Sequence, residues 1–325
     1  MAAVDLITVG SLFVEMTPTQ SGETLATAHR YTLVAGGAAA NMVFALARLG
    51  VTVRFITAVG DDAFGDLLVG DLRAGGVDTS HVRRAGGQLS SVSFCAVDQL
   101  GGKAFHFYRF PGYCAPMQAL TAADFAEVAD GRLFDFSEGS IREAALRALV
   151  FDAAARARAA GVPVLYAMNL RRSAWGVPDA AIRALQRQAV ALADIVVLNE
   201  EEALLLADDA RDPLRRVQEL GPRAVVMTRG GEGAMCARIG EIELSVPPYR
   251  VPVIYDVGAG DTFHAGLVAA LLHGDVTTLD PEGWGDALRF GAAAAAMRIS
   301  TSADPRDLPT AEQVIAWIGR HDAAG

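Results

Sequence analysis

The chain contains Asp256-Val257-Gly258-Ala259-Gly260-Asp261-Thr262-Phe263, followed at once by an apolar helical pattern from His264 to Leu272. Two small glycines just before a helix leave backbone N–H groups uncovered, and the helix dipole adds positive potential at the same place. We therefore predict an anion pocket built by Gly258, Ala259 and Gly260.

Asp261 stands at the end of this predicted pocket. A carboxylate there can accept a proton from an incoming hydroxyl while the neighbouring amides stabilise charge on a transferring phosphoryl group. The alternative is structural, with Asp261 serving as the N-cap of the helix after a glycine turn. The eight residues alone leave both interpretations open.

Composition narrows the class of protein. The 325 residues suit one large α/β domain with a small accessory part, and the net charge of −10 argues against nucleic acid or an anionic membrane as a partner. The three cysteines form no CxxC pair, which favours a reducing, cytoplasmic setting over a disulfide framework or a zinc site. We expect neither an export signal nor a membrane span, because the sequence lacks a basic n-region and an uncharged apolar stretch of about 18 residues.

Short β-branched runs alternate with Ala/Leu-rich amphipathic stretches along most of the chain. This rhythm predicts a mainly parallel central sheet flanked by helices. Two regions, 11–35 and 91–111, do not follow this rhythm. Apolar and polar residues alternate in them as in strands with one apolar and one polar face, which predicts a small inserted antiparallel β lid. The domain prediction is therefore an α/β domain of residues 1–10, 36–90 and 112–325, with the lid at 11–35 and 91–111. The predicted buried strands are Asp5–Val9, Val53–Ala58, Val162–Ala167, Ile195–Leu198 and Ala224–Thr228.

A second glycine-rich stretch, Gly36-Gly37-Ala38-Ala39-Ala40-Asn41, ends an apolar strand and precedes a predicted helix at Met42–Leu49 with Gly50 as its C-cap. Small residues here would let a ligand approach the backbone, with Asn41 donating and accepting hydrogen bonds. Tight packing between helix and strand is the structural alternative.

Together, the two stretches carry a family resemblance. Gly36–Gly50 resembles the N-terminal signature of the ribokinase-like (PfkB) carbohydrate kinases, and Asp256–Gly266 resembles their C-terminal one. Val59–Gly65 is similar to the G-x-D-x-x-G block of the same family. The resemblance covers most of the chain and is closest in pattern to the fructokinase and 2-keto-3-deoxygluconate kinase branch. It implies an ATP-dependent kinase that phosphorylates a hydroxyl of a sugar or sugar acid.

The resemblance also implies a set of acceptor-binding residues. Glu15 stands where the family usually has Asp, so its longer side chain puts preference for a common hexose in question. Ala167 stands where this branch commonly has Asp, two residues before Asn169. The implied acceptor-binding residues are Gly10, Glu15, Gly36, Gly37, Asn41, Arg109, Asn169 and Arg171.

Nucleotide and metal residues follow from two further matches. Asn199-Glu200-Glu201-Glu202 matches the N-x-x-E motif, whose residues organise magnesium, although Asn at the N-cap with Glu at N3 is also a capping box. Thr228–Gly233 resembles the T-x-G-x-x-G loop along the nucleotide. The implied cofactors are ATP and Mg²⁺, with a monovalent cation admitted as a third. The expected residues are Asn199, Thr228, Gly230 and Gly233 for the nucleotide, and Glu202 and Asp256 for the metal.

Two alternative functions fit the same sequence. A nucleoside kinase of the same fold would differ in the acceptor, and a non-catalytic sugar-binding or regulatory protein would lack turnover. No G-x-x-x-x-G-K-[ST], G-x-S-x-G or H-E-x-x-H motif occurs, which argues against P-loop NTPases, serine hydrolases of that class and zinc proteases. His264 and His273 are expected to be helix packing residues. The resemblance further implies a homodimer formed through the lid.

Overall fold

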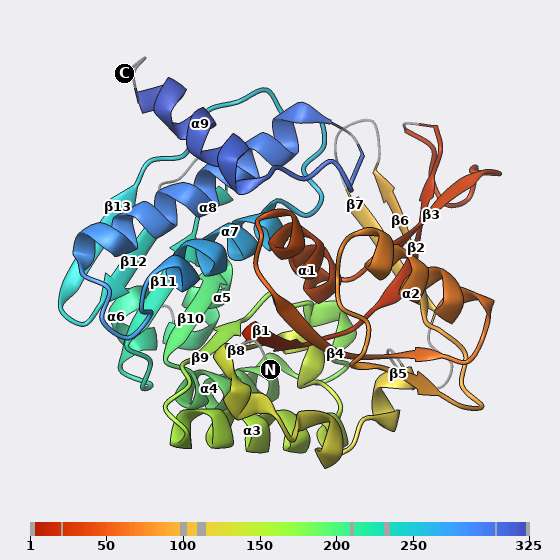
Figure 1. Cartoon of the computed structure of the whole chain (residues 1–325), viewed down its shortest axis with the longest axis horizontal. Helices are drawn as coiled ribbons and strands as arrows, with labels where there is room; N and C mark the ends of the chain where they lie inside the picture. Colours follow the sequence, from red (N-terminus) through yellow and green to blue (C-terminus); the bar gives the residue numbers. More distant parts are fainter. Residues whose placement is uncertain are drawn as a thin grey trace.

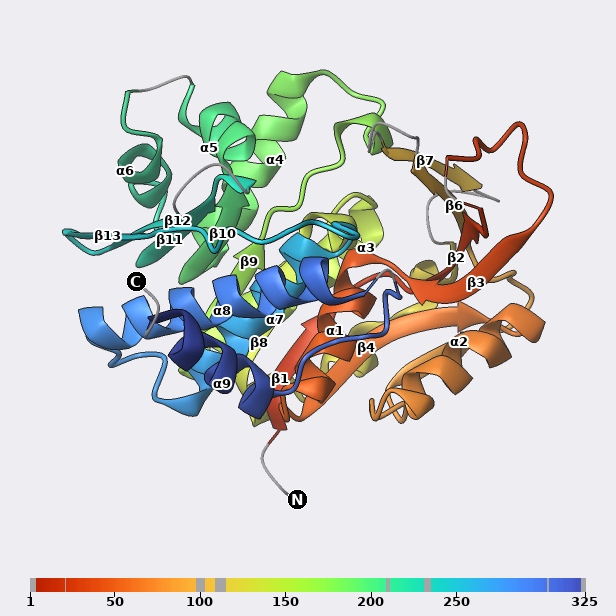
Figure 2. The same ribbon diagram turned by 90° about the horizontal axis from the view of Figure 1, so that it is seen from above.

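The fold class predicted from the sequence is confirmed. A computed structural model describes residues 4–20, 22–97, 103–108, 115–208, 211–230, 235–302 and 304–322. It contains a mainly parallel central sheet flanked by helices and a separate small sheet (Figures 1 and 2). Within these ranges no helix combines the length and the apolarity needed to cross a membrane.

Nine strands of the described chain form the main sheet, in the order β13-β12-β11-β10-β9-β8-β1-β4-β5. Every pair of neighbouring strands from β11 to β5 is parallel. The two antiparallel pairs, β11–β12 and β12–β13, form a β-meander at the other edge. The carboxyl ends of the parallel strands therefore meet at one edge, where open α/β sheets bind ligands. The strands are β1 (Val4–Val9), β4 (Val53–Gly60), β5 (Val82–Ala85), β8 (Gly131–Ser137), β9 (Val164–Ala167), β10 (Ile195–Asn199), β11 (Ala224–Thr228), β12 (Met235–Ile239) and β13 (Ile242–Val246).

Helices cover both faces of this sheet, and each face has its own apolar core. Alternate residues of the buried strand β1 contribute to opposite cores, Leu6 to one and Ile7 and Val9 to the other. Figure 1 shows α7 and α8 on one side of the sheet and α3 and α4 on the other. The helices are α1 (Ala38–Arg48), α2 (Ala63–Ala74), α3 (Ala144–Ala159), α4 (Asp179–Leu192), α5 (Glu200–Ala207), α6 (Pro213–Gln218), α7 (Ala259–His273), α8 (Pro281–Thr301) and α9 (Ala311–Asp322).

The small sheet consists of β2 (Phe13–Pro18), β3 (Tyr31–Gly36), β6 (Val92–Val97) and β7 (Lys103–Tyr108), in the order β3-β2-β6-β7. It lies at the opposite end of the molecule from β13, beside α2 (Figures 1 and 2). Its two hairpins are antiparallel as predicted, but β2 and β6 pair in parallel. Because a long stretch of the α/β domain lies between β2 and β6, the second hairpin can enter the sheet in the same direction as the first.

Close packing between α7 and α8 fixes the helix that begins with the predicted anion pocket. A Cβ atom on Gly266 of α7 would lie 2.8 Å from the Cα of Gly291 on α8. A Cβ on Gly291 would lie 2.9 Å from the carbonyl oxygen of Phe263. Only glycine permits this separation, so the two helices form one rigid support for the N-terminus of α7.

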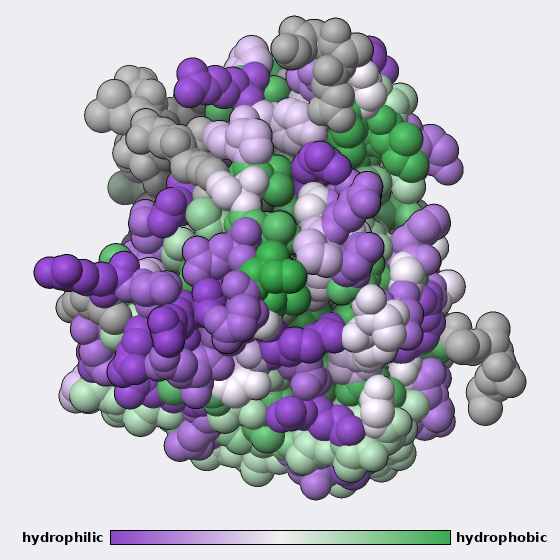
Figure 3. All heavy atoms as spheres, turned by 90° about the vertical axis from the view of Figure 1, so that its left-hand side faces the viewer, coloured by the Kyte–Doolittle hydropathy of each residue, from purple (hydrophilic) through white to green (hydrophobic). Residues whose placement is uncertain are grey.

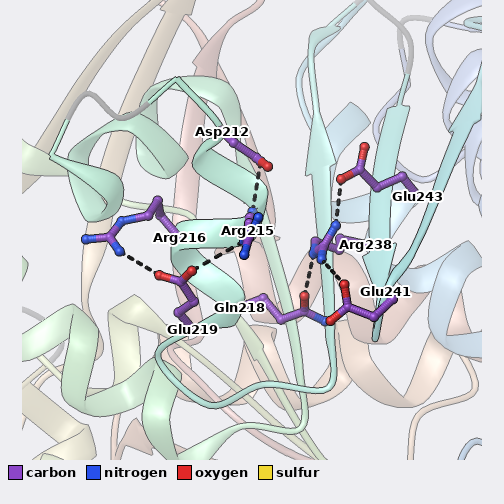
Figure 4. Close-up of polar contacts among 8 residues, drawn as sticks. All are labelled: Asp212, Arg215, Arg216, Gln218, Glu219, Arg238, Glu241 and Glu243. Carbon is purple, nitrogen blue, oxygen red and sulfur yellow. Dashed lines mark hydrogen bonds and ion pairs between the residues drawn. The ribbon is translucent and has the colours of Figure 1, made fainter.

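The β12–β13 hairpin is tied to α6 by Arg238, as Figure 4 shows. Its guanidinium donates to Gln218 at 2.6 Å, to Glu243 at 2.7 Å and to Glu241 at 2.9 Å. Figure 3 views the side of the molecule on which β13 lies. It shows hydrophilic residues interspersed with small clusters of apolar residues. Charge along an edge strand discourages pairing with another chain, and the network steadies the hairpin that continues into residues 247–250.

Both helices predicted after the glycine-rich stretches begin earlier in the structure than in the prediction. The helix after Gly37 begins at Ala38 rather than Met42, and α7 begins at Ala259 rather than His264. In both cases the small residues that we assigned to a loop already form the first helical turn. The start of α8 is capped by Asp280, whose side chain accepts a hydrogen bond from the Gly283 amide.

Candidate active site

Asp261 lies in the first turn of α7 and not at its N-cap. The N-cap is Gly258, whose φ of 84° falls in the left-handed region, and no side chain caps the helix. This geometry contradicts the capping interpretation, because the Asp261 carboxylate accepts instead from Asn41 Nδ2 at 2.9 Å and from Asn169 Nδ2 at 3.4 Å. The helix dipole favours an anionic side chain in this turn.

The surroundings of Asp261 shift the pKa of its carboxyl group upward from its ordinary value. Burial raises the pKa of its carboxyl group, while the hydrogen bond from Asn41, the charges of Arg171 and His264 and the contact with Asn169 oppose that rise. A general base works best when its pKa approaches the working pH.

Asn169 is held in an unusual backbone conformation beside Asp261. Its φ of 39° is one of two positive values at non-glycine residues among those described, and Asn tolerates this region better than most residues. The next residue is anchored, because the Leu170 amide donates to Glu202 Oε1 at 2.6 Å. Strained backbone of this kind persists where its surroundings fix it, often at functional sites.

A pocket at the carboxyl edge of the sheet collects most of the predicted acceptor residues. Glu15, Gly37, Asn41, Asn169, Arg171, Gly258 and Asp261 line it. Sequence reasoning missed other lining residues, notably Ser11, Phe13, Phe107, Glu138 and Arg142.

Two predicted glycines lie behind this pocket. A Cβ on Gly10 would lie 2.2 Å from the Cβ of Ala39, and one on Gly36 would lie 2.8 Å from the Cβ of Glu15. They permit close packing of the strand ends against α1 and β2, while Ser11 and Gly37 supply the lining. Arg109, also predicted to bind the acceptor, lies outside the described residues.

Glu15 is a titratable group in the same pocket. Burial raises the pKa of its carboxyl group to about 7, with the charge of Asp261 adding to the rise and that of Arg306 opposing it. Arg306 is itself held in place, because its guanidinium stacks 3.5 Å from the centre of the Phe44 ring and donates to the Ala35 carbonyl.

A buried ion pair supports the opposite wall. The Glu138 carboxylate accepts two hydrogen bonds from Arg142 in a bidentate pair, at 2.7 Å from Nε and 2.6 Å from Nη2. Trp175 Nε1 also donates to Glu138. This geometry orders the Arg142 side chain where it borders the pocket. The i,i+4 spacing of Glu138 and Arg142 directly after the unrecognised strand β8 is the sequence signal that could have identified them.

A second pocket lies on the other side of the α7 N-terminus. Thr228 and Gly230, which the sequence predicted to bind the nucleotide, line it together with Ala259 and Gly260 of the predicted anion pocket. Tyr249 also borders it, with Trp317 of α9 packed edge-on at 4.6 Å between ring centres. Gly233 lies outside the described residues. The first turn of α7 therefore faces both pockets, with Gly258 and Asp261 on one side and Ala259 and Gly260 on the other.

The predicted metal residues differ in their surroundings. Asp256 is exposed, at the loop before α7. Glu202 is only 5% exposed, and its two oxygens accept from the amides of Leu170 and Asn199, the latter at 2.8 Å. Asn199 Oδ1 accepts in return from the Glu202 amide at 2.9 Å, which completes the capping box predicted from the sequence. No group of three or more His, Cys, Asp or Glu side chains in the described chain could enclose a metal ion.

Comparisons with known proteins show the family of the chain. Residues 4–311 match the family model described as pfkB family carbohydrate kinase. Fructokinase-1 of Oryza sativa subsp. japonica is 30% identical, over 95% of this chain and 96% of the relative. The 5-dehydro-2-deoxygluconokinase of Clostridium perfringens is 27% identical, over 97% and 92%. The crystal structure of fructokinase with bound ATP from Xylella fastidiosa superposes with a TM-score of 0.85 at 27% identity, over 98% and 99%.

Proposed function

Because the chain belongs to the pfkB family of carbohydrate kinases and is therefore an ATP-dependent sugar kinase, we propose that Asp261 is its general base and that the α7 N-terminus is its anion hole. Family membership also removes the non-catalytic sugar-binding protein considered above. One observation carries the proposal: the first turn of α7 borders both pockets, with Asp261 lining one and Ala259 and Gly260 lining the other. A phosphoryl group crossing between two substrates must pass such a boundary.

In the proposed reaction the acceptor hydroxyl lies against Asp261. The carboxylate takes its proton as the hydroxyl oxygen forms a bond to the γ-phosphorus, and the bond from that phosphorus to the β,γ-bridging oxygen breaks. ADP leaves with the electron pair of the broken bond. The amides of Gly258, Ala259 and Gly260 stabilise the charge on the transferring group. Asn41 and Asn169 hold the carboxylate in place, since both donate to it.

We propose a ketohexose or a keto sugar acid such as a 2-keto-3-deoxygluconate-like molecule as the acceptor. Relatives named fructokinase and 5-dehydro-2-deoxygluconokinase support this class. Arg171 on the pocket wall supports recognition of a carboxylate, which a guanidinium can bind through two hydrogen bonds. Glu15 would accept hydrogen bonds from acceptor hydroxyls, and Arg109 keeps its predicted role at the lid.

The donor set fits magnesium bound mainly by nucleotide phosphates and water, because that ion usually takes only one or two protein carboxylates in kinases. Asp256 would supply one carboxylate, and Glu202 would act beside it through the loop that it anchors. Asn199, whose side chain completes the capping box, keeps its predicted place near the nucleotide phosphates. When bound, magnesium supplies positive charge that offsets the charge of the phosphates. We also retain a monovalent cation as a further cofactor, to be tested by the potassium dependence of turnover.

A nucleoside kinase remains the second candidate because two aromatic rings border the acceptor pocket. Phe13 and Phe107 lie edge to face, with 5.9 Å between ring centres. Such rings can pack against a base. Against this, the nearby Glu15, Arg142 and Arg171 favour a small polar acceptor.

The test is ADP release with a panel of ketohexoses, keto sugar acids, aldohexoses and nucleosides at matched concentrations. We expect the first two classes to give the highest kcat/KM. The kcat/KM of the best acceptor should then fall in Glu15→Asp, because the shorter side chain withdraws the carboxylate by about 1.5 Å. A nucleoside with the highest kcat/KM would overturn the acceptor assignment and leave the kinase assignment in place.

Three further expectations remain proposals. The division into an α/β domain and a lid follows the two sheets, and we propose that the lid closes over the acceptor. A homodimer through the lid is supported by exposed apolar side chains there, including Leu33 at 39% and Tyr108 at 60%; light scattering on the purified protein would test it. The cytoplasmic setting stays a prediction from cysteine usage.

A further inference from the structure

A buried pair of ionisable side chains lies beneath the candidate base and has no part in the reaction described above. Asp135, in the middle of β8, is 2% exposed, and His264, on α7, is 7% exposed. Their side chains meet at 3.1 Å between His264 Nε2 and Asp135 Oδ1. The other carboxylate oxygen accepts from the Thr8 hydroxyl at 2.7 Å. A carboxylate this deeply buried is stable only with such partners.

The pair is linked to the site by helix geometry. His264 follows Asp261 by three residues on α7, so the two side chains lie on the same face of the helix, roughly 5–6 Å apart at their Cβ atoms. Asp135 reaches His264 from the sheet below. Asp135 is therefore in contact with a histidine that lies next to the candidate base. His264 is buried, as the packing role expected from the sequence requires, and the contact with Asp135 is an additional feature.

We propose that Asp135 and His264 are positioning residues for the phosphoryl transfer: Asp135 orients the His264 imidazole, and the charge of His264 favours the ionised form of the Asp261 carboxylate. The inference rests on the proposed role of Asp261 as base. The other charged groups that act on Asp261 are Arg171, from the loop after β9, and Glu15, from β2. Arg171 favours the ionised Asp261 carboxylate, and the charge of Glu15 opposes its ionisation. The charge of His264 acts in the same direction as that of Arg171.

The direction of the effect follows from the charge. A protonated His264 lowers the pKa of Asp261 against the rise caused by burial. Removing that charge makes Asp261 harder to ionise, so the acid limb of the pH–rate profile moves to higher pH. Relative to the wild type, a variant without the charge should lose roughly three- to tenfold more turnover on the acid limb than at the alkaline plateau. This is the range expected for one nearby charge in a partly buried site.

His264→Gln is the main variant, because the glutamine amide can occupy the same space beside Asp135 but carries no charge. Asp135→Asn is the second and should move the acid limb in the same direction, since His264 loses its counter-ion. His273→Gln is the matched control, an exposed histidine in the last turn of the same helix, and its profile should overlay that of the wild type. Melting temperatures of all variants report any loss of folding separately.

Carbon-13 NMR of labelled aspartate, with the Asp261 signal assigned by its absence in Asp261→Asn, separates this inference from the proposed function. We expect the Asp261 carboxyl to titrate at higher pH in His264→Gln than in the wild type. An unmoved titration together with an unmoved acid limb would overturn the inference, even if stability fell. A moved titration in an enzyme whose Asp261→Asn variant still turns over would instead sustain the electrostatic pair and overturn the assignment of the base.

Discussion

Asn41 Nδ2 donates to Asp261 Oδ2 at 2.9 Å across a separation of 220 residues, joining the first turn of α1 to the first turn of α7. The two glycine-rich stretches that stood out in the sequence therefore meet at one carboxylate. Each places small residues at a helix start, and each contributes one member of the pair. The contact brings both stretches into one candidate site.

Removing this donor should weaken catalysis without removing the nucleotide site. In Asn41→Ala the Asp261 carboxylate loses a hydrogen bond to its charged form, so kcat/KM for the acceptor should fall roughly 10- to 100-fold. The Kd of ATP should stay within about threefold, because Asn41 borders the acceptor pocket and not the second one. Steady-state kinetics and ATP titration on the same preparation check both values. An unchanged kcat/KM would show that the contact is only structural.

Glu15 should make the protein less stable as pH rises. Its pKa is raised from 4.5 to about 7, chiefly by burial. The folded protein therefore holds this proton between those values while the unfolded chain has lost it, and stability falls with rising pH across that window. We expect Glu15→Gln to gain more in melting temperature over the wild type at pH 8 than at pH 5. Equal differences at the two pH values would contradict a half-buried Glu15 that retains its proton in the folded state.

Glu202→Gln tests the predicted metal residue against its structural contacts. The glutamine oxygen can accept from only one of the two amides that the carboxylate satisfies, so unfolding should become easier by about 1–3 kcal/mol. Because one of these amides belongs to Leu170, beside Asn169 and Arg171, the acceptor KM should also rise. If Glu202 also organises hydrated magnesium, the magnesium concentration for half-maximal turnover rises as well.

The matched control is Glu201→Gln, an exposed neighbour in the same turn of α5. It should leave stability, acceptor KM and magnesium response unchanged. A raised acceptor KM in Glu202→Gln with an unaltered magnesium response would limit this residue to anchoring the loop, and Asp256 would then be the sole protein carboxylate proposed for the metal.

Gly291→Ala should loosen the support of the anion pocket. The added methyl group meets the Phe263 carbonyl at 2.9 Å and the Leu267 amide nitrogen at 3.1 Å, both backbone atoms of α7. Overpacking of this kind costs roughly 1–3 kcal/mol of stability. Gly285→Ala, in the same helix with no atom within 4 Å of the new Cβ, is the control and should be neutral or slightly stabilising. Thermal unfolding compares the two, and equal melting temperatures would contradict the close-packing argument.

The sequence predicted the parallel sheet because its central strands are continuous β-branched runs, and Ala224–Thr228 is reproduced to the residue. Strands β12 and β13 were missed because polar residues such as Arg238 and Glu243 interrupt their pattern. Arg238 is nevertheless buried, since its partners come from both the hairpin and α6. Pairing of that kind depends on tertiary structure and leaves no local signal.

Within the site, the predictable residues are those placed by local motifs. The capping box of Asn199 and Glu202 and the glycine at the start of α7 are visible in a few consecutive letters. The role of the Glu202 carboxylate in holding Leu170 is not, because it joins the ends of two different strands. The same holds for Asp135 and His264, which contact each other only when β8 lies beneath α7.

The central claim is tested most directly by turnover of Asp261→Asn, measured as ADP release with the best acceptor beside ATP affinity and melting temperature. The amide nearly preserves the shape of the side chain but cannot take the hydroxyl proton, while the amides of Gly258, Ala259 and Gly260 remain for the phosphates. We predict a loss of turnover of roughly 10²- to 10⁴-fold, with ATP affinity and melting temperature close to the wild type. Near-normal turnover would contradict the assignment of Asp261 as the base.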